Sequence, residues 1–485
     1  MEKEGGRNGM SQRERMILIS IVLGTFMAAL DVTIVAVALP TMASEFATPG
    51  STGDVSWILL GYTLAICCCI LLWGRLGYNI GYRRIFLIGV GLFTTFSLLI
   101  GLGGTIEGMS LEMIILMRVA QGLGAGMLTS MGLAMVSTYL PGSKGFSVGI
   151  ITLAASAGTA FGPALGGILC HFHWSYIFLI NVPIGILCML MSMRYMGDIK
   201  EPQRERKSLD MIGVMLMAIM MLSLIYYLNM GREIGWMSNE SVLLISATLI
   251  SAGMLAWWER RGKDPLIPTR LMAIRDVLGG NVIALLLFAG MAGTYLLMPY
   301  YLQGCLGLTT VEMGLVLISN SLGMMLVGPT VGRISDRTGL NSKMVSIGCL
   351  VTAAGFFLMT LLEGDSHLWY VILSLFVMGM GVGIALVSCT NLCLGYSRDG
   401  EDGQISGLIN TFRQAGSTSG VAILETIFAS SIVIPAVIDP SNLDWLLTGF
   451  KPAFFMAMVM GLIAFTISMF LKDNKTRQKG ILDDE

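Results

Sequence analysis

The sequence predicts an all-α integral membrane protein, and three observations carry this prediction. Hydrophobic residues make up 54% of the 485 residues and charged residues only 13%, about half the charged fraction of a typical soluble domain. The apolar residues fall into runs of about 18 to 26, the length of a helix that crosses a hydrocarbon core of about 30 Å. Lysine and arginine gather in alternate gaps between these runs. We therefore expect lipid to surround most of the chain.

Fourteen apolar runs are predicted to span the membrane. Six lie near residues 16–39, 55–74, 85–104, 112–138, 146–170 and 176–196, two near 211–229 and 241–258, and six near 277–302, 312–331, 344–362, 369–395, 404–431 and 452–471. The first run is too long for the apolar region of a signal peptide, so it is interpreted as a retained first helix.

The basic residues predict the orientation of these spans. Cytoplasmic loops retain lysine and arginine during insertion. If the N-terminus is cytoplasmic, nearly all of the 30 Lys and Arg fall in cytoplasmic segments. An odd number of spans would place the basic C-terminal tail outside. We expect a multi-pass protein of the plasma (cytoplasmic) membrane with both termini in the cytoplasm.

A weak internal repeat predicts how the spans are grouped. The segment Gly74-Arg75-Leu76-Gly77 with Gly81 recurs as Gly332-Arg333-Ile334-Ser335 with Gly339, each in an expected short cytoplasmic loop. The copies are eight spans apart, whereas a duplicated six-helix unit would separate them by six. Spans 7 and 8 are therefore an insertion outside the two bundles. The expected organisation is a tail at 1–15, a six-helix bundle at 16–197, an inserted transmembrane hairpin at 208–260, a second six-helix bundle at 274–472 and a tail at 473–485.

Charged side chains inside the apolar spans are the first candidates for function. A carboxylate at the centre of a membrane costs about 2.5–3.5 kcal/mol, so such residues usually face a cavity or a partner. Asp31 interrupts the first span and Arg118 the fourth. We expect them to act together in proton coupling. The alternatives are that Asp31 caps its helix near the outer surface and that Arg118 is a structural clamp.

A second group of residues is expected to line a substrate cavity. Glu425 lies in the thirteenth span, close in helical phase to Gln414 and Thr418. Gln121 follows Arg118 at helical spacing, and Tyr295 belongs to an aromatic cluster in the ninth span. The alternatives are a helix cap for Glu425 and an interfacial aromatic belt for Tyr295.

Small residues recur every fourth position in the fifth span and predict close helix packing. The series is Gly158, Gly162 and Gly166, with Pro163 and Gly167 beside it. Such a groove lets another helix approach closely. Packing alone and a conformational pivot are equally compatible with this pattern.

Several other chemistries are not expected. The chain has three histidines, and His171 and His173 have no further ligand types nearby, so we predict no metal site. The nine cysteines lie mostly inside apolar spans, where they behave as small hydrophobic residues. No Walker A loop is present, no basic patch indicates nucleic-acid binding, and no cofactor or enzymatic activity is predicted.

Several segments, in order along nearly the whole chain, resemble the fourteen-helix drug and proton antiporters of the major facilitator superfamily, the EmrB/QacA type. The segments that carry the resemblance are Leu30-Asp31-Val32-Thr33-Ile34-Val35 with Ala38-Leu39-Pro40, Trp57 with Gly61-Tyr62, Arg118-Val119-Ala120-Gln121-Gly122-Leu123-Gly124, Gly158 to Gly167, Ile177-Phe178-Leu179-Ile180-Asn181-Val182-Pro183-Ile184-Gly185, Tyr301-Leu302-Gln303, and Asn410-Thr411-Phe412-Arg413-Gln414 with Gly420-Val421-Ala422. The resemblance implies two six-helix bundles that rock about a central cavity.

The resemblance also implies a function and a set of gating residues. It implies proton-coupled export of lipophilic small molecules, cationic ones included, with the substrate, protons and the lipid bilayer as partners; an accessory protein is left open. The implied cytoplasmic gating loops contain Gly74, Gly81, Arg83, Arg84, Gly332, Asp336 and Arg337.

One departure from the family pattern leaves other readings open. The family usually has Asp then Arg where this chain has Tyr78 and Asn79, although the second copy keeps Asp336 and Arg337. That departure puts gating by the first bundle in doubt. The alternatives are export of an endogenous metabolite, lipid or amphiphile, and a sensor or scaffold without transport.

Overall fold

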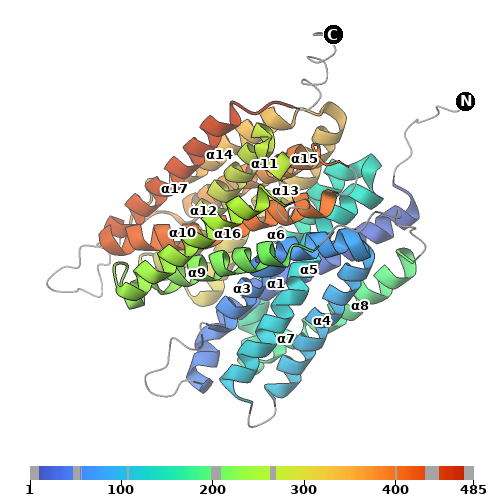
Figure 1. Cartoon of the computed structure of the whole chain (residues 1–485). Coiled ribbons are helices and arrows are strands. Elements are labelled where there is room, and N and C mark those ends of the chain that lie inside the picture. Colours follow the sequence, from blue (N-terminus) through green and yellow to red (C-terminus); the bar gives the residue numbers. More distant parts are fainter. Residues whose placement is uncertain are drawn as a thin grey trace, which may run out of the picture.

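The computed structural model of the chain describes residues 10–46, 55, 57–105, 109–197, 209–262, 269–398, 401–431 and 447–473. The regular elements of these residues are helices (Figure 1). Most of the two predicted tails lies outside the described residues. The helix α1 already begins at Gln12, inside the predicted N-terminal tail.

The long helices follow the predicted spans closely. The N-terminal set is α1 (Gln12–Phe46), α3 (Trp57–Ile80), α4 (Tyr82–Gly103), α5 (Leu111–Tyr139), α6 (Lys144–Phe172), the short α7 (Tyr176–Leu179) and α8 (Asn181–Tyr195). The central pair is α9 (Met211–Ile234) and α10 (Asn239–Glu259), and the C-terminal set is the short α11 (Thr269–Ala273), α12 (Arg275–Gly304), α13 (Thr310–Thr338), α14 (Asn341–Thr360), α15 (Leu368–Leu394), α16 (Asp402–Ser431) and α17 (Leu447–Ser468).

Thirteen stretches of helix within the described residues are long and apolar enough to cross a membrane, with α7 and α8 together forming one of them. The predicted span without a counterpart in this set is the thirteenth, at 404–431; it corresponds to α16, which is 30 residues long but rich in polar side chains. A helix with that composition is stable in a membrane only when its polar face is buried in protein or lines a cavity. The two-bundle arrangement supplies both environments.

The long helices outside the hairpin form two groups that pack mainly within themselves. In the first group α1 packs on α5, α6 and α8, while α5 packs on α3 and α4. In the second, α12 packs on α15, α16 and α17, while α14 packs on α15 and α17. The two groups meet along α6 and α13 and where α3 and α5 contact α16. The molecule therefore has the predicted two six-helix bundles.

The inserted hairpin lies beside both bundles (Figure 1). Its helix α9 packs on α10, on α3 of the first bundle and on α16 of the second. Only 17% of the membrane-length window of α10 is buried, compared with 67% for α15. Thus α10 presents most of its surface to lipid, whereas α9 bridges the bundles at one of their contacts.

The predicted gating residues do not lie in loops, which corrects the sequence prediction. Gly74 lies inside α3, and Gly332, Asp336 and Arg337 lie inside α13. These helices continue beyond their apolar segments because their polar ends pack against the opposite bundle. Only Gly81 marks a turn, and its φ of 111° is a conformation that favours glycine. Arg83 and Arg84 belong to the first turn of α4.

Candidate functional site

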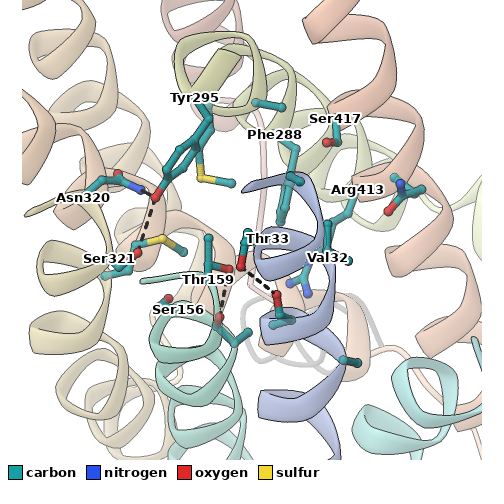
Figure 2. A pocket seen from close by; sticks show the side chains of 18 of the residues that line it. Val32, Thr33, Ser156, Thr159, Phe288, Tyr295, Asn320, Ser321, Arg413 and Ser417 are labelled. Atoms are coloured by element: carbon teal, nitrogen blue, oxygen red, sulfur yellow. Dashed lines mark hydrogen bonds between the residues drawn. The ribbon is translucent and has the colours of Figure 1, made fainter. Parts of the chain in front are cut away.

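A cavity of about 1020 Å³ lies between the two bundles. Its walls come mainly from α1 and α6 of the first bundle and from α12, α13 and α16 of the second (Figure 2). This volume is at the upper end of the range for small-molecule sites. The cavity is therefore large enough for an organic molecule with several rings.

The cavity wall is mostly apolar with scattered uncharged polar groups. Residues that line it and can make hydrogen bonds include Thr33, Ser156, Thr159, Gln303, Asn320, Ser321, Asn410, Gln414 and Ser417. In the second bundle the Asn320 amide donates to the hydroxyl of Tyr295 at 2.7 Å, and Tyr295 and Ser321 share a hydrogen bond at 3.4 Å. Figure 2 shows this group at one side of the cavity.

Arg413 is the one charged residue among the described residues that line the cavity. It lies on α16, and its Nη2 donates to Oγ1 of Thr390 at 2.5 Å. Its guanidinium carbon lies 5.7 Å from the ring centre of Phe288. No described carboxylate forms an ion pair with Arg413, and its Nε has no hydrogen-bond partner within the described part of the chain.

Asp31 and Arg118 lie together inside the first bundle, both with 0% exposure. Nη1 of Arg118 lies 2.6 Å from Oδ2 of Asp31. The other carboxylate oxygen accepts from the amides of Gln121 at 3.1 Å and Asn181 at 2.9 Å, and Gln121 also donates to Ser97 at 2.6 Å. Side chains of three helices, α1, α5 and α8, thus meet at one carboxylate. Neither charged residue belongs to the cavity lining, because the network turns both of them into the bundle core.

Tyr62 connects this network to the cavity. Its ring lines the cavity, and its centre lies 4.1 Å from the guanidinium carbon of Arg118. Arg118 also donates from Nε to the carbonyl of Ile58, one turn earlier on α3, at 3.1 Å. The Tyr62 hydroxyl and Nη2 of Arg118 have no partner among the described residues. A movement of Tyr62 would therefore change the surroundings of the buried ion pair.

The residues predicted to line the cavity divide into two sets. Gln414 and Tyr295 do line it. Gln121 lies instead in the Asp31 network, because its position one turn after Arg118 on α5 points it into the same core. Glu425 and Thr418 are also outside the lining, which is supplied on that part of α16 by Ser417 and Val421. No carboxylate therefore lines the cavity within the described residues.

The glycine series of α6 packs against α1. A Cβ at Gly158 would lie 2.6 Å from the carbonyl oxygen of Phe26, and one at Gly162 would overlap the Thr33 side chain. Pro163 lines the cavity. Gly166 is buried, whereas an atom added at Gly167 would meet nothing within 4 Å. Of the residues predicted to form a pivot, Gly158 and Gly162 thus pack closely against α1, whereas Gly167 does not.

Contacts between the bundles gather at the predicted cytoplasmic side of the cavity. Asp336 of α13 accepts hydrogen bonds from the backbone amides of Gly145 at 2.6 Å and Phe146 at 2.8 Å, at the start of α6. Lys144 donates to the carbonyl of Leu394 at 2.9 Å. On the other flank, Gly403 at the start of α16 donates to the Tyr82 hydroxyl at 3.3 Å.

The cavity reaches towards the opposite side. Its lining includes Tyr300 and Gln303 near the end of α12 and Met313 near the start of α13. These positions lie at the predicted outer ends of their helices. The arrangement is closed on the predicted cytoplasmic side and continues towards the predicted outer side.

Sequence reasoning missed three residues that the structure places at the site. Arg413 stands out in the sequence as an arginine inside an apolar span, but no local pattern indicates what its side chain faces. Asn181 and Tyr62 stand in segments that carry the family resemblance, yet neither is charged, so the cost of burying charge gave no signal for them. Their positions depend on how helices far apart in sequence pack together.

Comparisons with known proteins agree with this architecture. A model of the Major Facilitator Superfamily matches residues 21–421. The tetracenomycin C resistance and export protein of Streptomyces glaucescens is 31% identical over 434 residues, covering 88% of this chain and 78% of the relative. The multidrug resistance protein Stp of Mycobacterium tuberculosis is 31% identical over 427 residues, covering 87% and 77%.

A solved structure shares the fold at low sequence identity. The human organic anion transporter MFSD10 (TETRAN) superposes with a TM-score of 0.68 at 16% identity, covering 95% of this chain and all of that chain. The family match, the exporter relatives and the membrane-spanning helices together identify a multi-pass membrane transporter and not an enzyme. The chain belongs to the Major Facilitator Superfamily.

Proposed function

We propose that this protein is a proton-coupled antiporter that exports lipophilic small molecules across the plasma membrane, with both termini in the cytoplasm. The observation that carries the proposal is the buried Asp31–Arg118 pair directly behind the wall of the central cavity. The names of the relatives, a tetracenomycin C export protein and a multidrug resistance protein, support export as the direction.

Asp31 has the environment that a coupling carboxylate needs. Burial in an apolar region favours the protonated form of a carboxyl group, whereas a neighbouring arginine favours the charged form. A rearrangement that separates Asp31 from Arg118 would therefore promote proton uptake, and its reversal would promote release. Tyr62 could transmit such a rearrangement, because it touches both the cavity and Arg118.

Alternating access supplies the rearrangement. In transporters built from two bundles, rocking of one bundle against the other exposes a central site to each side in turn. One proton that crosses about 100 mV releases about 2.3 kcal/mol, which corresponds to a roughly fiftyfold gradient of a neutral substrate. A single titrating carboxylate is sufficient for this stoichiometry.

The test uses the purified full-length protein in liposomes and two transport assays. The first measures accumulation of a dye or metabolite driven by an imposed pH difference. The second measures exchange of labelled for unlabelled substrate with no gradient. We expect Asp31→Asn to abolish the first, because an amide cannot exchange a proton.

A second variant separates coupling from folding. Removing one member of a buried ion pair costs about 3–5 kcal/mol, since the other charge is left without a partner. The double variant Asp31→Asn/Arg118→Gln removes both charges and should fold better than the single one. We expect it to retain exchange and to lose gradient-driven accumulation. Accumulation at the parental rate in this double variant would show that Asp31 is not the coupling site. An absence of any flux by the parental protein across a broad panel would favour a sensor or scaffold.

A further inference from the structure

We propose that the central cavity selects lipophilic organic anions, with Arg413 as the residue that binds the acidic group of the substrate. This inference rests on the proposed transport function and names its substrate class. It departs from the cationic substrates that the family resemblance implies.

The charge of the cavity is the first argument. Arg413 is the one charged residue among its described lining residues, and no described carboxylate forms an ion pair with it. A charge in a largely apolar cavity is unfavourable unless an opposite charge compensates it. An anionic ligand supplies this compensation, whereas a cationic ligand adds a second uncompensated charge. The cavity therefore favours anionic ligands by attraction and disfavours cationic ligands by repulsion.

The hydrogen bonds of Arg413 are the second argument. A guanidinium group offers five N–H donors in a planar fork, and carboxylates match two of them at once. Nη2 donates to Thr390, which holds the side chain in place. Nε is buried without a partner in the described part of the protein, whereas Nη1 is not among the buried unpaired atoms there. The group is thus positioned by one contact and keeps donors for a ligand.

The walls around Arg413 suit the remainder of such a ligand. Phe288 lies beside the guanidinium group, and Figure 2 shows it between Arg413 and Tyr295. On the opposite bundle, the hydroxyls of Thr33 and Thr159 donate to carbonyls of their own helices. Their oxygens therefore keep lone pairs that can accept hydrogen bonds from a ligand. The geometry fits an apolar ring system that carries one acidic group and further hydroxyls.

Equilibrium binding to the detergent-solubilised full-length protein tests this proposal without any dependence on proton coupling. Three probes share one ring system: anthraquinone-2-carboxylate, its neutral methyl ester, and an anthraquinone with a quaternary ammonium group. We expect the carboxylate to bind at least about tenfold more tightly than the cation, as charged hydrogen bonds imply. Equal affinities, tighter binding of the cation or no binding of the carboxylate would overturn the proposal.

Variants of Arg413 and its neighbour sharpen the result. Arg413→Gln should lower the affinity of the carboxylate about tenfold or more, while the affinity of the ester stays within about twofold. Arg413→Lys keeps the charge and should retain most of the preference for the acid over the ester. Thr390→Val removes the positioning contact but no charge, so the preference should persist. An equal loss for acid and ester in Arg413→Gln would assign the residue a structural role and overturn the proposal.

A charge measurement distinguishes this inference from the proposed antiport. Exchange of one proton inward for one anion outward moves two positive charges inward, compared with one for a neutral ligand and none for a monovalent cation. In liposomes with a membrane potential but no pH difference, the potential should therefore drive the carboxylate more strongly than the ester. If the protein binds the anion preferentially but no gradient drives its flux, the proposed antiport is wrong and the proposed anion site stands. If a gradient drives flux but the protein shows no preference for the anion, only the proposed anion site is wrong.

Discussion

The two contacts that close the predicted cytoplasmic side make a useful comparison, because they occupy equivalent positions in the two bundles but differ in chemistry. Where α13 meets α6, the carboxylate of Asp336 accepts from two backbone amides at 2.6 and 2.8 Å. Where the end of α3 and the start of α4 meet α16, the neutral hydroxyl of Tyr82 on α4 accepts from the amide of Gly403 at 3.3 Å. The sequence departs from the family pattern in the second region, where Tyr78 replaces the usual Asp.

The difference shows which part of the repeated segment is indispensable for packing. Both regions keep a glycine that lies against backbone of the other bundle: Gly332 against Gly145, and Gly74 against Gly403. A negative charge at a helix N-terminus contributes about 0.3–1 kcal/mol at an exposed site. In contrast, a Cβ at either glycine would overlap the backbone of the opposite bundle, and no side-chain rotation can relieve that overlap. The two glycines therefore let the bundles close against each other, and the carboxylate of Asp336 adds to the stability of the closed state.

The largest effect is expected from adding a methyl group at either glycine. A Cβ at Gly332 would overlap the carbonyl of Gly145, and one at Gly74 that of Gly403. Because the opposing atoms are backbone, no side-chain rotation relieves the clash, and a cost near the upper end of about 1–3 kcal/mol is expected. Gly332→Ala and Gly74→Ala should each reduce the ratio of closed to open molecules on the order of a hundredfold.

Distances between spin labels measure this change. One pair of labels is placed at Gly142, just before α6, and at Thr338 of α13; a second pair is placed at Ile80 of α3 and at Arg398, just before α16. Both pairs are introduced in a background without the native cysteines. Gly167→Ala is the matched control, because an added Cβ there meets nothing within 4 Å. Unchanged distances in Gly332→Ala would contradict the assigned role of this contact.

A smaller effect is expected from Asp336→Ala. The side chain caps the first turn of α6 from another helix, and the loss of such a cap typically costs about 1 kcal/mol. Asp336 is exposed, so water can partly replace it. We expect the ratio of closed to open molecules to fall about fivefold. The loss should shrink at high salt, because charge near a helix terminus is screened. A loss that is independent of salt would point to packing instead of charge.

The smallest effect is expected from Tyr82→Phe. The variant keeps the buried ring and removes the long, neutral hydrogen bond from Gly403, which is worth about 0.5 kcal/mol. The ratio of closed to open molecules, measured with the labels at Ile80 and Arg398, should fall by only about twofold, with no dependence on salt. An effect larger than that of Asp336→Ala would reverse the comparison between the two regions.

The sequence by itself determined the membrane class, the helices and their grouping. These features follow from apolar runs of membrane-spanning length and from the cost of leaving backbone groups without hydrogen bonds in lipid. Both are local properties of the chain, so the predicted spans agree with the helices to within several residues. The pairing of Asp31 with Arg118 could also be anticipated, because two buried charges of opposite sign need a partner.

Only the tertiary structure decided where the polar side chains point. Gln121 and Gln414 look alike in sequence, yet one joins a buried network and the other lines the cavity. Arg413 lies in the wall of the cavity because the packing of α12, α15 and α16 places it there, and no local pattern encodes that packing. The direction of a side chain inside a membrane protein depends on which neighbouring helix covers it, and that is a property of the whole assembly of helices.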